Sequence, residues 1–462
     1  MLSLKSRRRR SRWSRQSSRS PWLTALLLMA SIPIGIELLA RLITMVTGFS
    51  ATVEENAVQK RTQGYQLQFV SPEGKPYADQ QATGGELQAK RNPLLGYQLL
   101  PKQSNQFWSL NAQGFREEDD VSPQKADGEI RIFIVGGSTA FGQLSTNNAN
   151  TLAQKMETLL TQRIEQQRTK PETFQPPVLP YWADKVQEAL ALPPRIKDGQ
   201  YRVINAAVPG YASGNDLAQL MHQVVLYNPD IVVVLNGYPD LLLPSAQPGA
   251  DVPGLEALLQ NETPGLMSQV GDRLQNGIDQ LMAVKIYRHY KNRSQPQQPA
   301  LKAPLNIAAT ELKPTLNDYV GQDAAELDQR VRRYRDNLDQ MVKWASGTQK
   351  RLIIGIQPEI TGRTADKLTP AEATIISNLD DSYQQWMQAG YERLNAQANQ
   401  VAQQSANATV VDLYSAYDSF PEQAFQSPTS LTDEATGVLA NRLYAAIANQ
   451  LSLKPISFAE AQ

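Results

Sequence analysis

Five short apolar runs recur along the chain and limit the folds open to it. They are residues 130–135, 202–206, 231–235, 352–356 and 409–413, each rich in β-branched side chains. Strands that are apolar nearly throughout are typical of a parallel sheet buried on both faces. Segments with helical spacing follow the runs, at residues 152–164, 217–227, 327–344, 375–405 and 433–451. Strand and helix in alternation predict a three-layer α/β/α sandwich around a mainly parallel five-stranded sheet.

The composition excludes several kinds of chemistry. Cysteine is absent from the sequence, which removes disulfides, thiol nucleophiles and thiolate metal sites, and the histidines number two. Lys and Arg total 45, as do Asp and Glu, so bulk charge gives no reason to expect a nucleic-acid partner. No phosphate-binding glycine motif follows a predicted strand, which argues against a nucleotide. We therefore expect no metal and no other cofactor.

The basic residues are concentrated at the N-terminus, ahead of an apolar segment. Residues 1–20 carry eight Lys or Arg and no acid, and residues 21–47 are mostly apolar. A helix of this length, at ~1.5 Å per residue, exceeds the ~30 Å hydrocarbon core of a bilayer. No clear cleavage site of a signal peptide follows. The positive-inside rule then predicts a cytoplasmic tail (1–20), a transmembrane signal anchor (21–47) and a main domain on the periplasmic or another extracytoplasmic side.

The remaining chain divides by composition. Residues 48–90 are polar and Gln-rich, which indicates a spacer from the membrane, and residues 453–462 form a short tail. The α/β domain is expected to span residues 91–452. Pro-rich stretches at about 169–194 and 241–320 interrupt its alternation, so we expect both to be excursions from the sheet.

The candidate site lies where the predicted strands end, because ligands of a parallel α/β sheet gather at the carboxyl ends of its strands. A Gly-Gly-Ser turn ending at Ser138 follows the first run, and such a turn exposes the hydroxyl and free peptide N–H groups. Gly210 follows the second run, and Gly237 and Asp240 follow the third. Nearby aromatic side chains either pack in the core or line the site: Phe141, Tyr211 and Tyr238.

Five segments at these places together resemble the SGNH hydrolases, also called GDSL-like esterases, and in particular their membrane-anchored bacterial members. They are NAQGFR (111–116), IVGGSTAFG (134–142), VINAAVPGYAS (203–213), PDIVVVLNGYPDL (229–241) and SLTDEATGVLANRL (430–443). The resemblance covers roughly residues 91–450 and implies the flavodoxin-like fold of that family.

The resemblance also implies roles for single residues and shows where this chain departs from them. Ser138 matches the nucleophile that also lends its N–H to the oxyanion hole, and Gly210 matches a second N–H donor. In the G-x-N-D block, which begins here at Gly237 and ends at Asp240, the oxyanion asparagine is replaced by Pro239. In the D-x-x-H block, the aspartate and the histidine are replaced by Ser427 and Ser430.

These replacements favour a catalytically degenerate protein, because a serine hydroxyl is a poor nucleophile without an adjacent base. Such a protein would act in ligand binding or envelope assembly, and the resemblance suggests an acylated glycan or an envelope protein as its partner. The alternative is an active serine esterase or O-acyltransferase on acylated cell-surface polysaccharide. Its base would then be displaced to one of the following: His222, His289, Asp240, Glu359 or Asp433.

Two further expectations concern residues outside the blocks. The excursion at residues 241–320 could contact another membrane protein, which would make the chain a scaffold. Arg116, in the first of the five segments, is expected to form a structural salt bridge with a neighbouring acid rather than to bind a ligand carboxylate.

Overall fold

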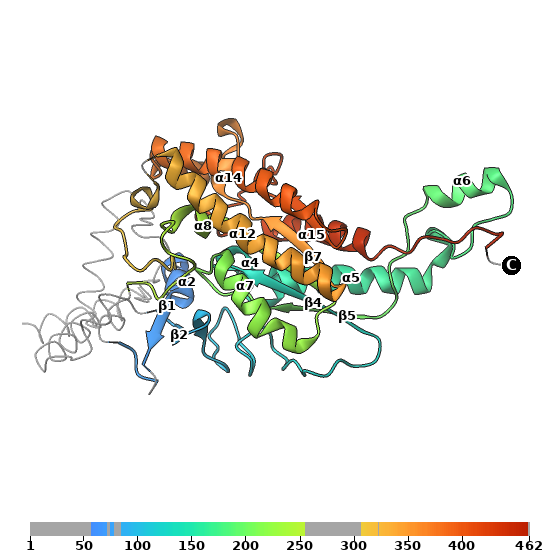
Figure 1. Cartoon of the computed structure of the whole chain (residues 1–462), viewed down its shortest axis with the longest axis horizontal. Coiled ribbons are helices and arrows are strands. Elements are labelled where there is room, and N and C mark those ends of the chain that lie inside the picture. Colours follow the sequence, from blue (N-terminus) through green and yellow to red (C-terminus); the bar gives the residue numbers. More distant parts are fainter. Residues whose placement is uncertain (1–56, 72–73, 78–84, 255–305, 322, 461–462) are drawn as a thin grey trace, which may run out of the picture. The chain divides into compact units, whose positions relative to one another are not determined.

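A parallel five-stranded sheet lies at the centre of the computed structural model (Figure 1). The structure describes residues 57–71, 74–77, 85–254, 306–321 and 323–460, all of one unit. The strands, in spatial order, are β5 (Gln200–Asn205), β4 (Glu129–Gly136), β6 (Ile231–Asn236), β7 (Arg351–Ile356) and β8 (Ala408–Asp412). Numbered along the chain this order is 2-1-3-4-5, which is that of a doubly wound, flavodoxin-like sheet. All five predicted strands are confirmed to within two residues at each end.

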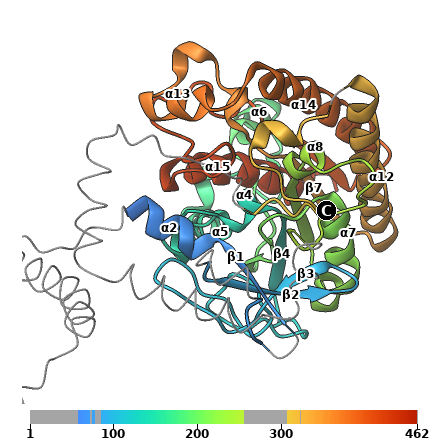
Figure 2. The same ribbon diagram turned by 90° about the vertical axis from the view of Figure 1, so that its left-hand side faces the viewer.

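Helices cover both faces of the sheet and complete three layers, as Figure 2 shows. One layer holds α7 (Ser213–His222), α12 (Ala324–Thr348) and α14 (Asp381–Ala402), and the other holds α5 (Leu152–Thr169) and α15 (Asp433–Gln450). The buried side chains of α12 recur at intervals of three and four residues: Leu327, Val331, Tyr334, Leu338, Met341 and Ala345. This spacing gives the helix one apolar stripe, which it packs on the sheet.

Polar side chains fix where these helices begin. The hydroxyl of Thr151 accepts a hydrogen bond from the amide of Gln154 and so caps α5, and Thr432 caps α15 in the same way. The Asp323 carboxylate accepts from the amide of Glu326 at the start of α12. Each cap satisfies an amide that has no partner within its helix.

Shorter helices connect these elements. The α-helices are α2 (Ala57–Tyr65), α4 (Ser138–Phe141), α6 (Ala183–Ala191), α8 (Tyr238–Leu242) and α13 (Pro370–Ser377). The 3-10 helices are η1 (Asn148–Asn150), η2 (Pro171–Thr173), η3 (Val224–Tyr227), η4 (Leu316–Tyr319), η5 (Ile360–Gly362) and η6 (Ala365–Lys367).

A second, three-stranded sheet corrects the expectation of a polar spacer at residues 48–90. It consists of β1 (Leu67–Val70), β2 (Leu87–Asn92) and β3 (Gly96–Leu99), with β1 parallel and β3 antiparallel to β2. With α2 it belongs to the folded domain, because the apolar side chains of β1 and β2 join the main core. These strands alternate apolar and polar residues, so their average hydropathy resembles that of a linker.

The segment predicted as the first excursion carries η2 and α6 and is paired with the C-terminal tail. The Leu179 amide donates to the Ile456 carbonyl across 2.9 Å, so residues 453–460 lie against the segment that carries α6. Residues 241–254 and 306–320 are described for the second excursion, and its middle lies outside the described residues.

The predicted cytoplasmic tail and signal anchor, residues 1–47, also lie outside the described residues. Among the helices of the described ranges, none combines the length and the apolar character needed to span a bilayer.

Candidate functional site

Ser138 lies at the turn between β4 and α4, at the carboxyl edge of the sheet. The turn depends on Gly136, which has φ of +147°; a Cβ there would lie 2.1 Å from the Leu235 carbonyl oxygen. Only glycine fits such a position. Ser138 itself is half-buried, and its hydroxyl makes no hydrogen bond to any residue that the structure describes. The hydroxyl is thus partly exposed, as the resemblance implies, but no base among the described residues is hydrogen-bonded to it.

Gly210 follows β5 at the same edge, as predicted, and is covered by two segments distant in sequence. It has φ of +87°, and a Cβ there would lie 2.4 Å from the Asn306 carbonyl oxygen and 2.6 Å from the Tyr97 hydroxyl. The Tyr97 hydroxyl donates to the carbonyl of Pro209, the preceding residue. The small N-terminal sheet and the returning end of the second excursion therefore close over this glycine.

Pro239 occupies the third block and lies against the Ser138 turn. Its Cγ would be 3.6 Å from a Cβ placed on Gly137, so the proline ring is next to the turn where the family's asparagine would act. Proline has no side-chain donor and no N–H. Gly237, with φ of +122°, permits the sharp bend from β6 into α8. The nearby Asn236 amide donates to the Tyr211 carbonyl (3.1 Å) and to Asp216, so it does not replace the missing donor.

Asp240 is a structural residue rather than a displaced base. Its carboxylate is fully buried and accepts hydrogen bonds from the amide (2.9 Å) and the hydroxyl (2.6 Å) of Ser213, the first residue of α7. Arg333 lies 3.7 Å from the same carboxylate. Burial raises the pKa of Asp240, and the charge of Arg333 opposes that rise. Asp240 therefore holds the start of α7 against α8.

Ser427 and Ser430 lie beside α4 and bond to each other. The Ser427 hydroxyl donates to the Ser430 hydroxyl across 2.8 Å, and the Ser430 amide donates back to Ser427 Oγ across 3.0 Å. Both side chains are buried. The Thr139 hydroxyl donates to the Thr429 carbonyl (3.0 Å), which ties this loop to the helix that Ser138 begins. The loop therefore lies next to the Ser138 turn. The positions that match the family's aspartate and histidine hold two uncharged serines that are hydrogen-bonded to each other.

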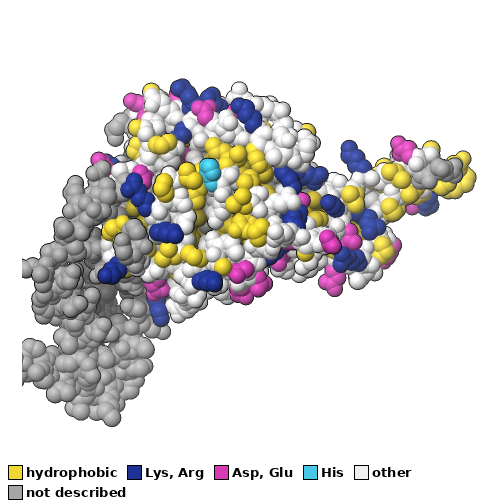
Figure 3. Space-filling view, turned by 60° about the horizontal axis from the view of Figure 1, so that its bottom comes forward, with side chains coloured by type: hydrophobic (Ala, Val, Ile, Leu, Met, Phe, Trp, Pro, Cys, Tyr) yellow, Lys and Arg dark blue, Asp and Glu magenta, His cyan; other side chains and the backbone are white. Residues whose placement is uncertain are grey.

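Two further candidate bases, His222 and Asp433, are described by the structure, and neither is bonded to Ser138. His222 is exposed at the end of α7, nine residues beyond Ser213, which at ~1.5 Å per residue is ~13 Å from the carboxyl edge. It is the cyan side chain at the surface in Figure 3. Asp433 accepts a hydrogen bond from the Thr146 hydroxyl. His289 lies outside the described residues.

Glu359 is buried within a group of tyrosines that sequence analysis did not identify. Its carboxyl group accepts from the Thr361 amide (2.8 Å) and hydroxyl, and the Tyr383 hydroxyl lies 3.2 Å from it and 3.1 Å from the Tyr238 hydroxyl. Burial raises the pKa of Glu359 to about 7, although these hydrogen bonds oppose the rise. The Tyr391 hydroxyl, also buried, has no hydrogen-bond partner among the described residues. Glu359 thus titrates near neutral pH, and its carboxyl oxygens already accept hydrogen bonds from Thr361 and Tyr383.

The aromatic residues predicted near the site belong to the core. Phe141 and Tyr211 are fully buried and Tyr238 is 7% exposed. The Tyr211 ring packs edge-on against Tyr97 with ring centres 5.3 Å apart, and its hydroxyl donates to the Tyr97 carbonyl. Of the two roles left open, core packing is therefore the one they have.

Arg116 is structural, as predicted, but the predicted acidic partner is wrong. Its buried guanidinium donates to neutral acceptors, among them Phe141 O (2.9 Å), Gly142 O (2.8 Å) and the Tyr65 hydroxyl (2.7 Å). These partners are the last turn of α4 and the end of α2. A planar guanidinium with five donors suits such a junction. The sequence analysis placed the residues of α2 in a spacer outside the domain, so it did not predict these partners.

Groups of acidic or histidine side chains that could hold a metal ion are absent from the described residues.

The chain was compared with family models, with curated proteins and with solved structures. No family model matches the chain, and no curated protein does.

Several solved hydrolases are similar to the chain. One is an alpha/beta hydrolase from the metagenome of Lake Arreo, Spain, at 13% identity and a TM-score of 0.33, covering 72% of this chain and 99% of that one. A lipase/acylhydrolase from Enterococcus faecalis has 14% identity and a TM-score of 0.33, covering 71% and 98%. An acetylxylan esterase from Geobacillus stearothermophilus has 13% identity and a TM-score of 0.32, covering 71% and 96%.

Similarity at this level does not say what the chain binds or does. The sheet order, the Gly-Gly-Ser turn after β4 and the last loop beside α4 are features of the chain itself. They confirm the predicted SGNH-hydrolase-like fold.

Proposed function

We propose that this chain is a catalytically degenerate SGNH hydrolase, anchored in the membrane by residues 21–47, whose extracytoplasmic domain binds an acylated glycan of the cell envelope without cleaving it. The single observation that carries the proposal is the hydrogen bond between the hydroxyls of Ser427 and Ser430. Neither hydroxyl can take a proton from Ser138 near neutral pH, since an alcohol is not a base in that range.

The loss of the base is accompanied by loss of an oxyanion donor. In serine hydrolases, removing one such donor costs ~10²–10³ in rate, and removing the base of the triad costs about 10⁶, as in subtilisin. In this chain Pro239 replaces the donor and Ser430 replaces the base. Both changes point to the same conclusion, that ester turnover is lost.

The part of the site that remains, the Ser138 turn, can still bind a ligand. Ser138 retains its turn, and its half-exposed hydroxyl is free to donate to a carbonyl or sugar oxygen. Such a hydrogen bond contributes about 0.5–1.5 kcal/mol. An acyl ester offers a carbonyl at the place where the family's substrates react, and here it would remain intact.

The test measures hydrolysis and binding on the same protein. The full chain and Ser138→Ala are each incubated with an activated acetyl ester, and both should hydrolyse it at the rate of buffer alone. Binding is measured by calorimetry with an O-acetylated oligosaccharide, and its deacetylated form is the control ligand. We expect the acetylated form to bind more tightly to the native chain and to lose that preference in Ser138→Ala.

Two results would contradict the proposal in different ways. Turnover that depends on Ser138 would show an active esterase with a base elsewhere. Absence of both turnover and an acetyl preference would leave the degenerate site without a ligand of this class.

A further inference from the structure

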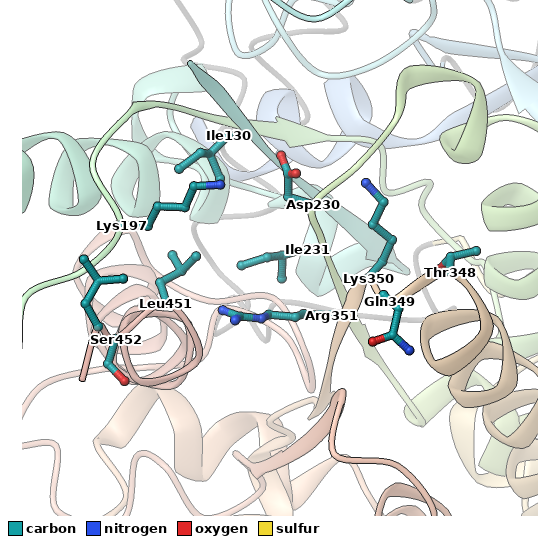
Figure 4. Close-up of a pocket in the computed structure, with 11 residues that line it drawn as sticks. Ile130, Lys197, Asp230, Ile231, Thr348, Gln349, Lys350, Arg351, Leu451 and Ser452 are labelled. Carbon is teal, nitrogen blue, oxygen red and sulfur yellow. The ribbon is translucent and has the colours of Figure 1, made fainter. Parts of the chain in front are cut away.

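A cavity of about 340 Å³ lies at the amino edge of the sheet, opposite the site described above. Its lining residues come from the starts of β4, β6 and β7, from the loop before β5, and from the ends of α12 and α15: Ile130, Lys197, Asp230, Ile231, Thr348, Gln349, Lys350, Arg351, Leu451, Ser452 and Leu453 (Figure 4). Eight residues of β4 at ~3.3 Å each separate the two edges by roughly 20–25 Å. The cavity is therefore independent of the Ser138 site.

The charged groups of the cavity are three cations and one acid, and the acid is already engaged. Asp230 pairs with Lys125 and accepts the Arg131 amide across 2.8 Å. Lys350 donates to the Asn228 side chain across 2.9 Å. Since the Asn228 amide is neutral, none of the three cations of the cavity is paired with an acid among the described residues, and Lys197 and Arg351 also lack a neutral acceptor.

Lys197 and Arg351 have no side-chain hydrogen bond and no ion pair with any residue that the structure describes. Arg351 is half-buried, and its guanidinium is open to solvent in the cavity without an acceptor among the described residues. Elsewhere the fold supplies acceptors to its buried arginines: carboxylates in the pairs Arg131–Glu129, Arg330–Glu326 and Arg363–Glu372, and carbonyl and hydroxyl oxygens for Arg116. The absence of such a partner for Arg351 marks it as open to a ligand.

The two helix ends that border the cavity do not use these cations. Cations often stabilise the last carbonyls of a helix. Here the Lys350 amide donates to the Ala345 carbonyl (3.0 Å) at the end of α12. At the end of α15 the Ser452 hydroxyl donates to the Asn449 carbonyl (2.7 Å). These carbonyls have partners, so the side chains of Lys197 and Arg351 are not their caps.

The rest of the lining combines polar side chains (Thr348, Gln349 and Ser452) with apolar ones (Ile130, Ile231, Leu451 and Leu453). Figure 4 shows Lys197 and Arg351 reaching in from different elements, with Ile231 and Leu451 between them in that view. Ile231 is fully buried and Leu451 is 6% exposed, so both are fixed in the core, whereas Leu453 is 50% exposed and presents an apolar surface. A pocket in which cations lie beside accessible apolar surface suits a ligand with an anionic head and a hydrocarbon body.

We propose that this cavity binds a small amphiphilic anion, whose phosphate or carboxylate head pairs with Arg351 and Lys197 and whose apolar body lies on Leu451 and Leu453. Arginine binds such oxyanions through two parallel N–H donors, and the neighbouring ammonium adds a second charge. The cavity volume lies at the lower end of the range for small-molecule sites, which limits the body to a short chain.

The test is calorimetric titration of the full chain with hexyl phosphate, hexanoate and inorganic phosphate. Hexyl phosphate should bind, hexanoate should bind at the same site, and inorganic phosphate should bind at least about tenfold more weakly because it lacks the apolar body. Arg351→Gln should weaken hexyl phosphate about tenfold or more. Lys197→Gln should weaken it less, since its ammonium is more exposed.

Arg332→Gln is the matched control, because Arg332 is an exposed arginine on α12 outside the cavity and loses the same charge. It should leave all three affinities unchanged. Equal weakening by Arg332→Gln and Arg351→Gln would overturn the proposal, as it would show only general charge attraction. Equal affinities for hexyl phosphate and inorganic phosphate, or no binding by the native chain, would also overturn it. Circular dichroism of each variant confirms that it is folded.

Discussion

The hydroxyls of Ser427 and Ser430 are 2.8 Å apart and bonded to each other, in a loop held against the helix that Ser138 begins. The loop is therefore in place for catalysis while its side chains are not. The resemblance to the SGNH hydrolases implies a base at Ser430 and an orienting carboxylate at Ser427, and in this chain both positions are buried.

The first prediction is recovery of esterase activity in the triple variant Pro239→Asn, Ser427→Asp and Ser430→His. The three changes restore an oxyanion donor, an orienting carboxylate and a base on a turn that is already formed. We expect hydrolysis of an activated acetyl ester to rise at least about 100-fold above the native chain, well short of a full triad. The control carries Ser138→Ala in addition and should return to background. Activity that survives in that control would arise from another site.

The second prediction concerns Gly136, which lies directly before the Ser138 turn. Gly136→Ala should destabilise the chain by more than about 3 kcal/mol, because the new Cβ would meet the Leu235 carbonyl at 2.1 Å and φ is positive. Gly347→Ala is the matched control within α12, where a Cβ meets nothing within 4 Å. It should stabilise by about 0.5–1 kcal/mol. Urea unfolding of both variants measures the difference, and equal effects would contradict this account of the turn.

The third prediction concerns Arg116, which joins α4 to α2. Arg116→Ala leaves several buried acceptors without donors and should cost about 3 kcal/mol or more. Arg335→Ala, which removes an exposed pair with Asp336, should cost less than about 1 kcal/mol. Urea unfolding measures both. If α2 were a detached spacer, limited proteolysis would cut between α2 and β1 equally in the native chain and in Arg116→Ala; we expect faster cleavage only in the variant.

The fourth prediction concerns the pH dependence that Glu359 gives to stability. Its folded pKa of about 7 exceeds the ordinary value of 4.5, so the folded state binds the proton more tightly than the unfolded state. This contribution is fully present below pH 4.5 and is lost as pH rises through about 7. Glu359→Gln should remove it, and should make the chain more stable than native at pH 8 by on the order of 1–3 kcal/mol.

Glu326→Gln is the control with the opposite sign. Partial burial acts to raise the pKa of Glu326, but hydrogen bonds from Ser245 and Arg330 prevail and lower it. Its stabilising contribution is therefore present above pH 4.5 and lost as pH falls through the lowered pKa. Urea midpoints at pH 5 and pH 8 compare the two variants: the difference between Glu359→Gln and the native chain should change between these pH values, whereas that of Glu326→Gln should stay constant. A Glu359→Gln variant with the native pH profile would contradict the assignment.

The sheet and its site-bearing turns were accessible to sequence analysis because buried parallel strands are apolar without interruption. Their ends mark the carboxyl edge, and Ser138 and Gly210 follow directly. Strands β1 and β2 could not be predicted from the sequence, since half of their residues are polar and they form no continuous apolar run. A contact with the main core, not local composition, determines that they are strands.

The roles of Asp240 and Glu359 depend on partners that the sequence separates widely. Asp240 is bonded to Ser213, 27 positions away, and the Tyr383 hydroxyl near Glu359 meets Tyr238 at a separation of 145 positions. Such pairs follow from how helices pack on the sheet. The motif at Asp240 therefore predicted a residue of the site. In the structure Asp240 instead binds the first residue of α7.

The mutual bond of Ser427 and Ser430 also bears on the evolutionary history of the chain. Either serine changed alone to aspartate or histidine would place a titratable or bulky group in a buried position that now holds a neutral hydroxyl pair, which costs stability. A histidine alone would lack its orienting carboxylate, and an aspartate alone would orient no histidine. If the proposed degeneracy holds, the path back to a hydrolase therefore passes through single variants that lose stability before the base and its orienting carboxylate are both present.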